Sequence, residues 1–242
     1  MNVIFLGAGR ATASEAEENR YPAWLHEVGP STILERIALP LLKAPGNHLI
    51  YCFLEADVQK FRLNEIISVI DPNQTLISVQ TGTQGAACTA LLAADMVDND
   101  SELMIVSLNE YIEVDLVSAT DDFRARNLDG GTLVFPSVHP RYSFVRLDDN
   151  QNVIEAAQGR PISQAATIGA FWFRRGSDFV HGIKQMIRKG DHHDGRYFVC
   201  PVFNQLILMQ RRIGVSWIEP TLYHPLKTEA QIHHFEFDPK QS

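Results

Sequence analysis

The sequence is poor in cysteine, has no long apolar run and has no excess of positive charge. Its 242 residues include three scattered cysteines, Cys52, Cys88 and Cys200, with no CxxC pair. This sparse, odd-numbered set indicates reduced thiols rather than a disulfide framework. No apolar run approaches the roughly 18 residues of a membrane span, and the N-terminus lacks the basic stretch of a signal peptide. We therefore expect a soluble cytoplasmic protein with no membrane partner.

The charge balance is acidic, with 21 Lys and Arg against 29 Asp and Glu, a net charge of −8. A protein that binds duplex nucleic acid is more often basic and carries a Lys/Arg stripe, which is missing here. A nucleic-acid partner is therefore not expected. An acidic protein that handles anionic nucleotides would use a metal ion or local arginines to offset the repulsion.

An apolar run followed by a glycine turn opens the chain. Residues 3–6 read VIFL and predict a buried strand, and Gly7-Ala8-Gly9-Arg10 follows at once. Two glycines allow a sharp turn whose N–H groups can hold a phosphate, beside an arginine. This arrangement suggests a nucleotide site at the carboxyl edge of a parallel sheet. The alternative is a tight strand-to-loop turn with no ligand.

The same turn departs from a dinucleotide-binding fingerprint. The third position of that pattern is Thr12 instead of Gly or Ala, and no acid stands in residues 29–33, where the ribose-binding carboxylate is expected. The first acid at a predicted strand end is Glu55, which comes far too late. The pattern therefore disfavours NAD binding.

Apolar periodicity predicts alternating strands and helices, and hence an α/β fold with a mixed sheet. Ser31 or Thr32 is expected to cap the first helix, and Pro40 to kink or shorten its last turn. Asp148-Asp149-Asn150 predicts a hairpin turn. We expect residues 233–242 to be partly disordered. The predicted strands are 3–6, 48–54, 75–79, 103–108, 132–136, 143–147, 153–157, 166–173 and 215–218; the predicted helices are 31–42, 58–70, 86–94, 177–187 and 198–209.

Four blocks carry a family resemblance over about residues 1–220. They are Leu6–Arg10 leading to Tyr21–Leu25, Thr83–Thr89, Ile105–Asp115, and Asp129–Gly131 through His139–Ser143 to Gly169. In this order the blocks resemble the sugar-phosphate nucleotidyltransferases, above all the short forms of bacterial capsule and surface-polysaccharide clusters. The resemblance implies one α/β domain with a Rossmann-like mixed sheet, residues 1–125 forming a nucleotide-binding half and residues 126–225 an acceptor-binding half with a small hairpin region.

The resemblance also implies an activity and a set of site residues. The family transfers NMP from an NTP to a phosphorylated sugar or alcohol and uses Mg²⁺. As catalytic residues, Arg10 and Arg20 would neutralise the phosphates and Arg160 would hold the acceptor. Asn109 with Glu110 or Asp115 would organise the metal. His139, Arg141 and Gly169 would contact the acceptor. The nucleotide would be held by Leu6, Gly7, Ala8, Gly9, Gln80, Gly85 and Ala86.

Several charged positions of the family motifs are neutral in this chain. Ala23 stands where the family has a lysine that stabilises the α-phosphate, and Asn109 replaces the strand-end aspartate that holds Mg²⁺. Gln158 and Gly159 replace a Glu-Lys pair that grips the acceptor. Losing one such electrostatic group typically costs roughly 10²- to 10³-fold in rate. The rival hypothesis is therefore an inactive relative that binds a nucleotide, a sugar phosphate or a protein partner.

A glycosyltransferase of related fold would need an Asp-x-Asp pair at a strand end, and residues 107–110, SLNE, do not supply one. Asp191-His192-His193-Asp194 looks like a metal cluster, but the usual spacing of further ligands is missing, which favours a solvated loop. The segment His139–Arg141 is either an anion contact or a turn fixed by Pro140. The sequence leaves open the nucleobase, the acceptor and whether the chain forms a homo-oligomer.

Overall fold

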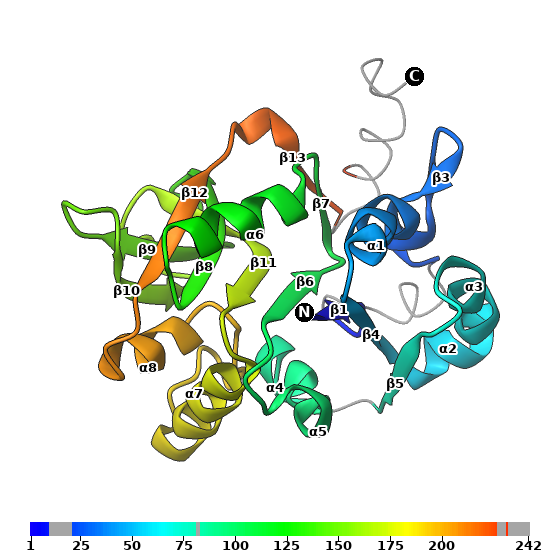
Figure 1. The fold of residues 1–242 in the computed structure, drawn as a ribbon, viewed down its shortest axis with the longest axis horizontal. Helices are drawn as coiled ribbons and strands as arrows, with labels where there is room; N and C mark the ends of the chain where they lie inside the picture. Colours follow the sequence, from blue (N-terminus) through cyan, green and yellow to red (C-terminus); the bar gives the residue numbers. More distant parts are fainter. Residues whose placement is uncertain (10–20, 81–82, 227–230, 232–242) are drawn as a thin grey trace.

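The computed structural model describes residues 1–9, 21–80, 83–226 and 231, and a mixed sheet forms the centre of this part of the chain (Figure 1). Within the described residues the sheet has nine strands, in the order β10-β9-β11-β6-β1-β4-β5, with β8 paired to both β11 and β12. The strands are β1 (Asn2–Leu6), β4 (His48–Leu54), β5 (Thr75–Val79), β6 (Leu103–Ser107), β8 (Gly130–Pro136), β9 (Ser143–Leu147), β10 (Val153–Gln158), β11 (Ala165–Phe173) and β12 (Ile213–Trp217). The predicted α/β fold with a mixed sheet is confirmed.

The N-terminal half of the sheet is parallel. β1 lies between β4 and β6 and pairs with both in parallel, and β5 pairs in parallel with β4. Nearly every side chain of β1 and β4 is buried, because helices cover both faces of these strands. The four strands therefore end at one edge of the sheet, and the glycine turn after Leu6 lies at that edge.

The C-terminal half of the sheet is mostly antiparallel. β11 pairs with β6, β8 and β9, and β9 with β10, all antiparallel, whereas β12 joins β8 in parallel. The β9–β10 hairpin turns at Asp148, whose carboxylate accepts the N–H groups of Asn150 and Asn152 at 2.9 and 2.8 Å. The predicted hairpin turn is confirmed. The β11 register shifts between Thr167 and Phe171, next to Gly169.

Helices cover both faces of the sheet, and the sheet separates two apolar clusters. One cluster lies under α1 (Ile33–Lys43), α3 (Leu63–Ile70) and α6 (Leu116–Ala125). The other lies under α4 (Ala86–Leu91), α7 (Gly176–Lys189) and α8 (Val202–Leu208), with α5 (Ala94–Val97) at its edge. α2 (Glu55–Phe61) precedes α3, and the short 3-10 turns are η1 (Ala23–Leu25) and η2 (Pro220–Leu222). Among the described residues, no helix is long and apolar enough to cross a membrane.

Two small ribbons lie outside the main sheet. β2 (Glu27–Val28) pairs with β3 (Ser31–Thr32) before α1, and β7 (Glu110–Ile112) pairs with β13 (Tyr223–Pro225). β7 follows β6 directly, so the second ribbon joins the end of the parallel half to the C-terminal part of the chain. Neither ribbon was among the predicted strands.

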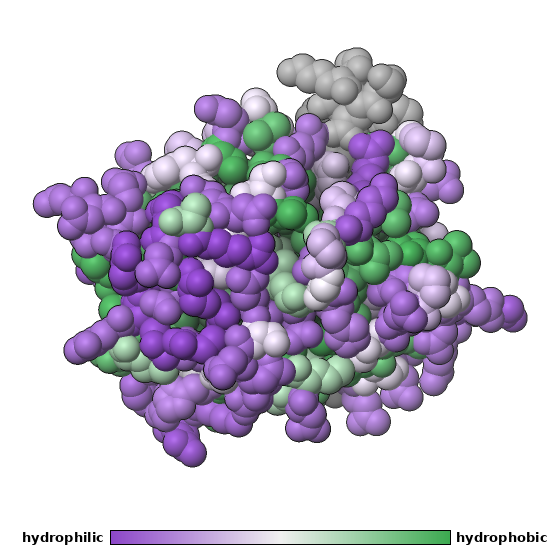
Figure 2. Space-filling view, in the orientation of Figure 1, coloured by the Kyte–Doolittle hydropathy of each residue, from purple (hydrophilic) through white to green (hydrophobic). Residues whose placement is uncertain are grey.

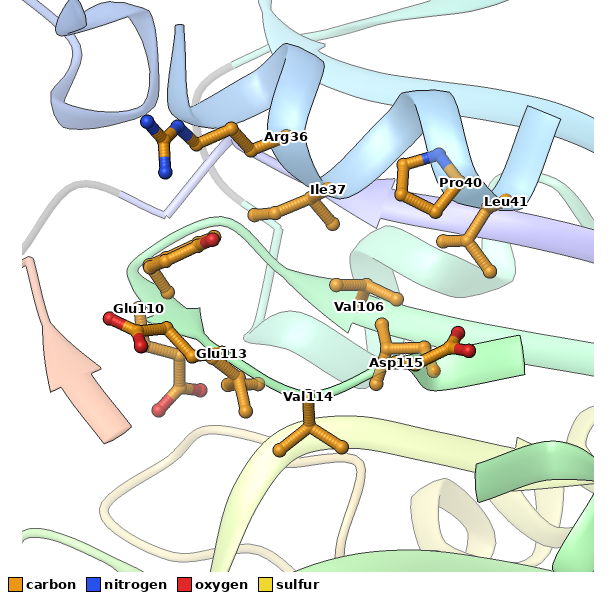
Figure 3. Close-up of a pocket in the computed structure, with 12 residues that line it drawn as sticks. Arg36, Ile37, Pro40, Leu41, Val106, Glu110, Glu113, Val114 and Asp115 are labelled. Carbon is orange, nitrogen blue, oxygen red and sulfur yellow. The ribbon is translucent and has the colours of Figure 1, made fainter. Parts of the chain in front are cut away.

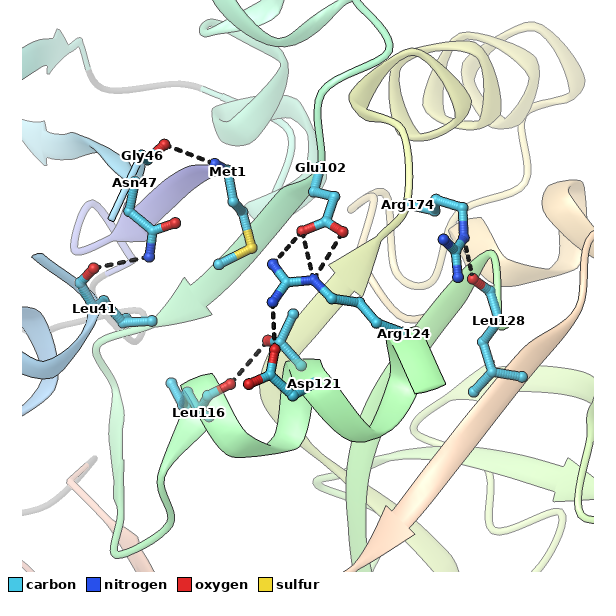
Figure 4. A network of polar contacts seen from close by, with 11 residues as sticks. Met1, Leu41, Gly46, Asn47, Glu102, Leu116, Asp121, Arg124, Leu128 and Arg174 are labelled. Carbon is cyan, nitrogen blue, oxygen red and sulfur yellow. Dashed lines mark hydrogen bonds and ion pairs between the residues drawn. The ribbon is translucent and has the colours of Figure 1, made fainter. Parts of the chain in front are cut away.

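Polar contacts attach α6 to the start of β6 (Figure 4). The Arg124 guanidinium donates from Nε to both carboxylate oxygens of Glu102, at 2.9 and 3.1 Å, and from Nη1 to Asp121 at 2.5 Å. In the same view the N-terminal amine of Met1 donates to the Gly46 carbonyl at 2.9 Å. Figure 2 shows a largely hydrophilic face, with polar residues gathered over α6 and its neighbourhood.

One helix prediction needs correction, because the helix predicted over 86–94 ends at Leu91. The segment 58–70, predicted to contain a helix, holds the end of α2 and all of α3, separated at Arg62, which adopts a left-handed conformation (φ 49°). The helix predicted within 198–209 is confirmed as α8. α1 continues through Pro40 to Lys43, and its N-terminal prediction is confirmed by a capping box between Thr32 and Glu35. The predicted tail 233–242 lies outside the described residues.

Candidate functional site

The glycine turn begins against a pair of stacked aromatic rings. Gly7 donates its N–H to the Cys52 carbonyl at 3.0 Å, and a Cβ at Gly7 would lie 2.3 Å from the Phe53 ring. The Trp24 ring stacks on Phe53, with centroids 4.4 Å apart and planes 12° apart, and Trp24 is 4% exposed. Packing therefore explains why residue 7 is glycine, and Trp24 belongs to the core.

Gly9 continues the turn at the surface, beside the end of β6. Gly9 is exposed, and a Cβ there would lie 3.1 Å from Nδ2 of Asn109. β1 and β6 are parallel neighbours, so the turn after one strand meets the residues after the other. The structure thus brings together the predicted phosphate-binding turn and the predicted metal position.

The two arginines expected to help at this turn, Arg10 and Arg20, lie outside the described residues. Ala23, at the position of the family lysine, is half-buried in η1. Leu6 is buried in β1, and Ala8 packs against the apolar cluster under α4. Within the described residues, the turn is therefore lined by backbone and small side chains.

Gly85 packs closely against the backbone of a distant segment, at Tyr197. Its φ is +107°, and a Cβ would lie 2.5 Å from the Tyr197 carbonyl oxygen. Tyr197 donates its N–H to the Gln84 carbonyl at 2.7 Å and accepts from Ala87 N–H at 3.1 Å. Backbone pairing and positive φ thus account for glycine at this position. Contact of Gly85, Ala86 and the exposed Gln80 with a base stays a prediction.

The Glu110 side chain points into the fold and is not exposed as a metal ligand at the surface would be. It is 8% exposed on β7, and a Cβ at Gly169 would lie 2.0 Å from its Oε1. The pKa of the Tyr223 hydroxyl is raised by burial, then by the Glu110 carboxylate and Tyr142, both of which it hydrogen-bonds. The structure thus unites Glu110 and Gly169, predicted for metal and acceptor, in one buried polar cluster.

A cavity of about 570 Å³ opens from Glu110 between α1 and the segment leading into α6 (Figure 3). Ile37 and Leu41 of α1 and Val106 of β6 form part of its apolar wall. Glu113 and Asp115 line it as well, and Arg36 stands at one end, donating to the Val28 carbonyl at 3.1 Å. This cavity adjoins the end of β6 but is not lined by Gly9 or Gly85.

The donor set at the Asn109 position is weak for Mg²⁺. Mg²⁺ in proteins is held by carboxylates, waters and substrate phosphates. Among the described residues no group of three or more His, Cys, Asp and Glu side chains could hold a metal ion. Asn109 offers one neutral oxygen, and the Glu110 carboxylate is engaged inside the fold. The described residues therefore do not form a Mg²⁺ site by themselves.

The predicted acceptor residues His139 and Arg141 lie on an exposed turn. Tyr142 donates its N–H to the His139 carbonyl at 3.2 Å, and His139 Nδ1 accepts from Arg141 N–H at 3.3 Å. The Arg141 guanidinium lies over the Tyr142 ring at 4.8 Å. Arg160 is 71% exposed and pairs with Glu155 at 3.1 Å. Arg141 therefore lies against an aromatic ring on the turn, and Arg160 is paired with a carboxylate.

His193 lies close to Gly159, a contact that the sequence did not indicate. Its ring lies against Gly159, whose Cβ would be 2.6 Å from Nε2. Residues 191–194 are all exposed. In the described part of the chain, neither histidine belongs to a group of three or more side chains that could hold a metal ion. The loop prediction for DHHD agrees with this exposure.

The cysteines are poor nucleophiles in this fold. Burial raises the pKa of Cys52 and of Cys200 to about 12, and burial also raises the pKa of the half-buried Cys88. A thiol needs to be ionised to attack. The three cysteines are therefore not expected to act as nucleophiles.

No family model and no curated protein sequence matches the chain, whereas solved structures match it over nearly its whole length. A nucleoside-diphosphate-sugar pyrophosphorylase from Vibrio cholerae RC9 superposes with a TM-score of 0.76 at 18% identity, covering 98% of this chain and 100% of the other. A UDP-glucose pyrophosphorylase complexed with UDP-glucose gives 0.75 at 10% identity, over 97% and 96%. HddC from Yersinia pseudotuberculosis, complexed with GMP-PN, gives 0.64 at 11%, over 97% of each chain. The chain therefore has the fold that these proteins share.

Proposed function

Starting from this sugar nucleotidyltransferase fold, we propose that the chain transfers NMP from an NTP to a phosphorylated sugar or alcohol, for the synthesis of surface-polysaccharide precursors. The observation that carries the proposal is the meeting of Gly9 and Asn109 at one edge of the parallel strands. In open α/β sheets ligands bind outside the carboxyl ends of the strands. The exposed glycine turn lies at that place.

Each group of residues has a separate task in this proposal. The amides of Ala8 and Gly9 donate to the NTP phosphates, and Arg10 and Arg20 neutralise them. The Gly7 amide, already bonded to the Cys52 carbonyl, fixes the start of the turn. Gly85 and Ala86 border the base. The acceptor phosphate attacks the α-phosphate in line, and pyrophosphate leaves. Because the described residues form no Mg²⁺ site, no step is assigned to a protein-held metal.

An inactive relative is the second candidate function, and a specific observation favours it. Ala23 and Asn109 supply no charge next to the turn, and Glu110 is turned into the fold. Transfer of a phosphoryl group depends mostly on electrostatic positioning. In that case the same turn would bind a nucleotide or sugar phosphate without turnover.

The direct test measures pyrophosphate release. The protein is incubated with each NTP, Mg²⁺ and a panel of sugar 1-phosphates and polyol phosphates, and NTP binding is measured by calorimetry. Turnover above a protein-free control supports the proposal. Binding without turnover supports the inactive relative. If the protein shows neither NTP binding nor turnover, both candidate functions are contradicted.

Restoring the missing charges gives a second test. The double variant Ala23→Lys/Asn109→Asp should raise pyrophosphate release about tenfold or more, because each restored group stabilises charge at the α-phosphate or the metal. Asn73→Asp, on an exposed turn between α3 and β5, adds a carboxylate at the opposite edge of the sheet from the carboxyl ends of the parallel strands. It is the matched control. An equal rise in the control, or no rise in the double variant, would contradict this assignment of the two positions.

A further inference from the structure

The strand β5 forms one end of the main sheet and pairs with β4 on one side. Alternate residues of such an edge strand direct their N–H and C=O groups away from the sheet, where they can pair with another strand. In the described part of the chain, no group outside β4 hydrogen-bonds to the backbone of residues 75–79. The outer row of β5 can therefore accept a further strand.

The other two strands with one ladder neighbour, β10 and β12, are closed by groups from elsewhere in the chain. The Asn204 side chain on α8 accepts from the Ala156 N–H of β10 and donates to the Ala156 carbonyl, both at 2.8 Å. On β12, Gly214 forms a backbone bridge with Asn152. Among the described residues, β5 is thus the edge whose outer backbone groups are left for water or for a partner.

The side chains of β5 also reach solvent at this edge. Ser78 is exposed, and Thr75, Leu76 and Ile77 are partly exposed, whereas the neighbouring β4 is buried except at its two ends. Leu76 packs against the apolar cluster under α1, and Ile77 against the cluster under α4. Apolar surface therefore extends to the edge on both faces of the sheet, and an added strand would remove part of it from water.

This edge carries none of the charged residues that usually protect a strand from pairing with another chain. Natural edge strands are often protected by lysine, by other charged side chains or by proline. Residues 75–79, TLISV, contain none of these, and they lie within residues 72–94, the longest stretch of the sequence without Asp, Glu, Lys, Arg or His. In a chain of net charge −8, two copies meet with least repulsion along such a neutral segment.

We propose that β5 is an interface between two copies of this chain, which pair antiparallel about a two-fold axis and join their sheets. A second copy is the partner that fits, because it presents the same unpaired backbone groups and because a neutral edge cannot select a partner of opposite charge. Thr75, Ile77 and Val79 are β-branched and favour strand pairing. The inference does not depend on the proposed transfer reaction.

The size of the interface sets the expected affinity. Five residues on each strand are few beside the roughly 1,600 Å² that a standard stable interface buries. The dimer should therefore be reversible, with a Kd of roughly 1–100 μM.

Sedimentation velocity of the full chain, across a range of concentrations that brackets this Kd, tests the proposal. The wild type should change from monomer to dimer as its concentration rises. Ser78→Lys should raise Kd about tenfold or more, because the two-fold axis brings each lysine near its own copy. Ser101→Lys, at an exposed position before β6, is the matched control and should leave Kd unchanged. A wild type that stays monomeric throughout, or an equal rise of Kd in the control, overturns the proposal.

A charge swap identifies the interface without relying on loss of function. Ser78→Glu should also weaken the dimer when it is measured alone. An equimolar mixture of Ser78→Lys and Ser78→Glu should dimerise about as well as the wild type, since opposite charges then meet across the axis. If the mixture dimerises no better than either variant alone, β5 is not the interface.

Hydrogen exchange gives the same test for the backbone. The amides of residues 75–79 should exchange more slowly at concentrations above Kd than below it, by about tenfold at the positions that gain a hydrogen bond. The amides of β10, whose edge Asn204 already contacts, should exchange at the same rate at both concentrations. A dimer that forms without slower exchange in β5 would place the interface elsewhere.

Discussion

The packing of Glu110 against Gly169 explains why residue 169 is a glycine. Motif resemblance assigned Gly169 to the acceptor and Glu110 to a metal, from positions distant in the sequence. In the structure the Glu110 carboxylate occupies the place of a side chain at position 169, and Tyr223 joins the same cluster. Glycine is required there whether or not an acceptor binds.

A double-mutant cycle can measure this steric dependence. Gly169→Ala places a methyl group 2.0 Å from Oε1 of Glu110 and should destabilise the protein by about 1–3 kcal/mol. In a Glu110→Ala background the same change should cost less, because the carboxylate is gone. Urea unfolding of the wild type, both single variants and the double variant gives the coupling energy. Additive effects would show that the two side chains do not meet.

Some residue-scale features could be predicted and others could not. The meeting of Gly9 with Asn109 follows from two parallel strands ending at one edge, which the apolar runs already indicate. The contact between Gly159 and His193 depends on where a loop after α7 crosses the sheet edge. No local pattern in the sequence encodes that crossing, so DHHD looked only like a weak metal motif.

At the scale of elements, long apolar runs made good predictions. The strands predicted over 48–54, 75–79 and 143–147 match β4, β5 and β9 residue for residue. β7 and β13 have three residues each and are stabilised by pairing with each other across nearly half of the chain. Such short strands carry too little periodicity to be recognised. α6 was missed for a related reason, since its polar residues leave only a narrow apolar stripe.

The N-terminus of α6 offers a prediction with pH dependence. The Asp115 carboxylate accepts from Ser118 Oγ at 2.6 Å and from Val117 N–H at 2.9 Å, and the Ser118 hydroxyl lowers the pKa of Asp115. Asp115→Ala should cost about 1 kcal/mol at neutral pH. Because the folded-state pKa is depressed, this stabilisation is present above the ordinary pKa of about 4 and is lost as pH falls below it.

Unfolding free energies of the wild type and Asp115→Ala between pH 7 and pH 3 check this expectation. The difference should shrink toward the acid end. Asp149→Ala, on the exposed turn between β9 and β10, removes a carboxylate away from α6 and serves as the comparison. A constant difference across this range would argue that the carboxylate does not cap α6.

At the scale of the whole molecule, alternating strands and helices predicted the α/β class, and the order of the four blocks predicted the nucleotidyltransferase fold. The structure adds that the two predicted halves share a single sheet, with β6 of the first half paired to β11 of the second. Sequence patterns show which faces are apolar. They do not show which strands become neighbours.

Thiol reactivity should report the integrity of this shared core. Cys52 is 0% exposed in one apolar cluster, and Cys200 is 1% exposed in the same cluster, from the other half of the chain. Both thiols should resist a disulfide reagent in the native protein and react together on unfolding in urea. Cys88, which is half-buried, should react first. Single-cysteine variants separate the three, and early reaction of Cys200 alone would show that the second half opens independently.

The antiparallel junction of β6 with β11 has a mechanical consequence. Residues 103–106 and 170–173 pair continuously through backbone hydrogen bonds. The two halves therefore cannot rotate apart as rigid bodies unless the hydrogen bonds between β6 and β11 break. Any closure around a bound ligand has to come from side chains and from the loops at the edge of the sheet, while the strands keep their relative positions.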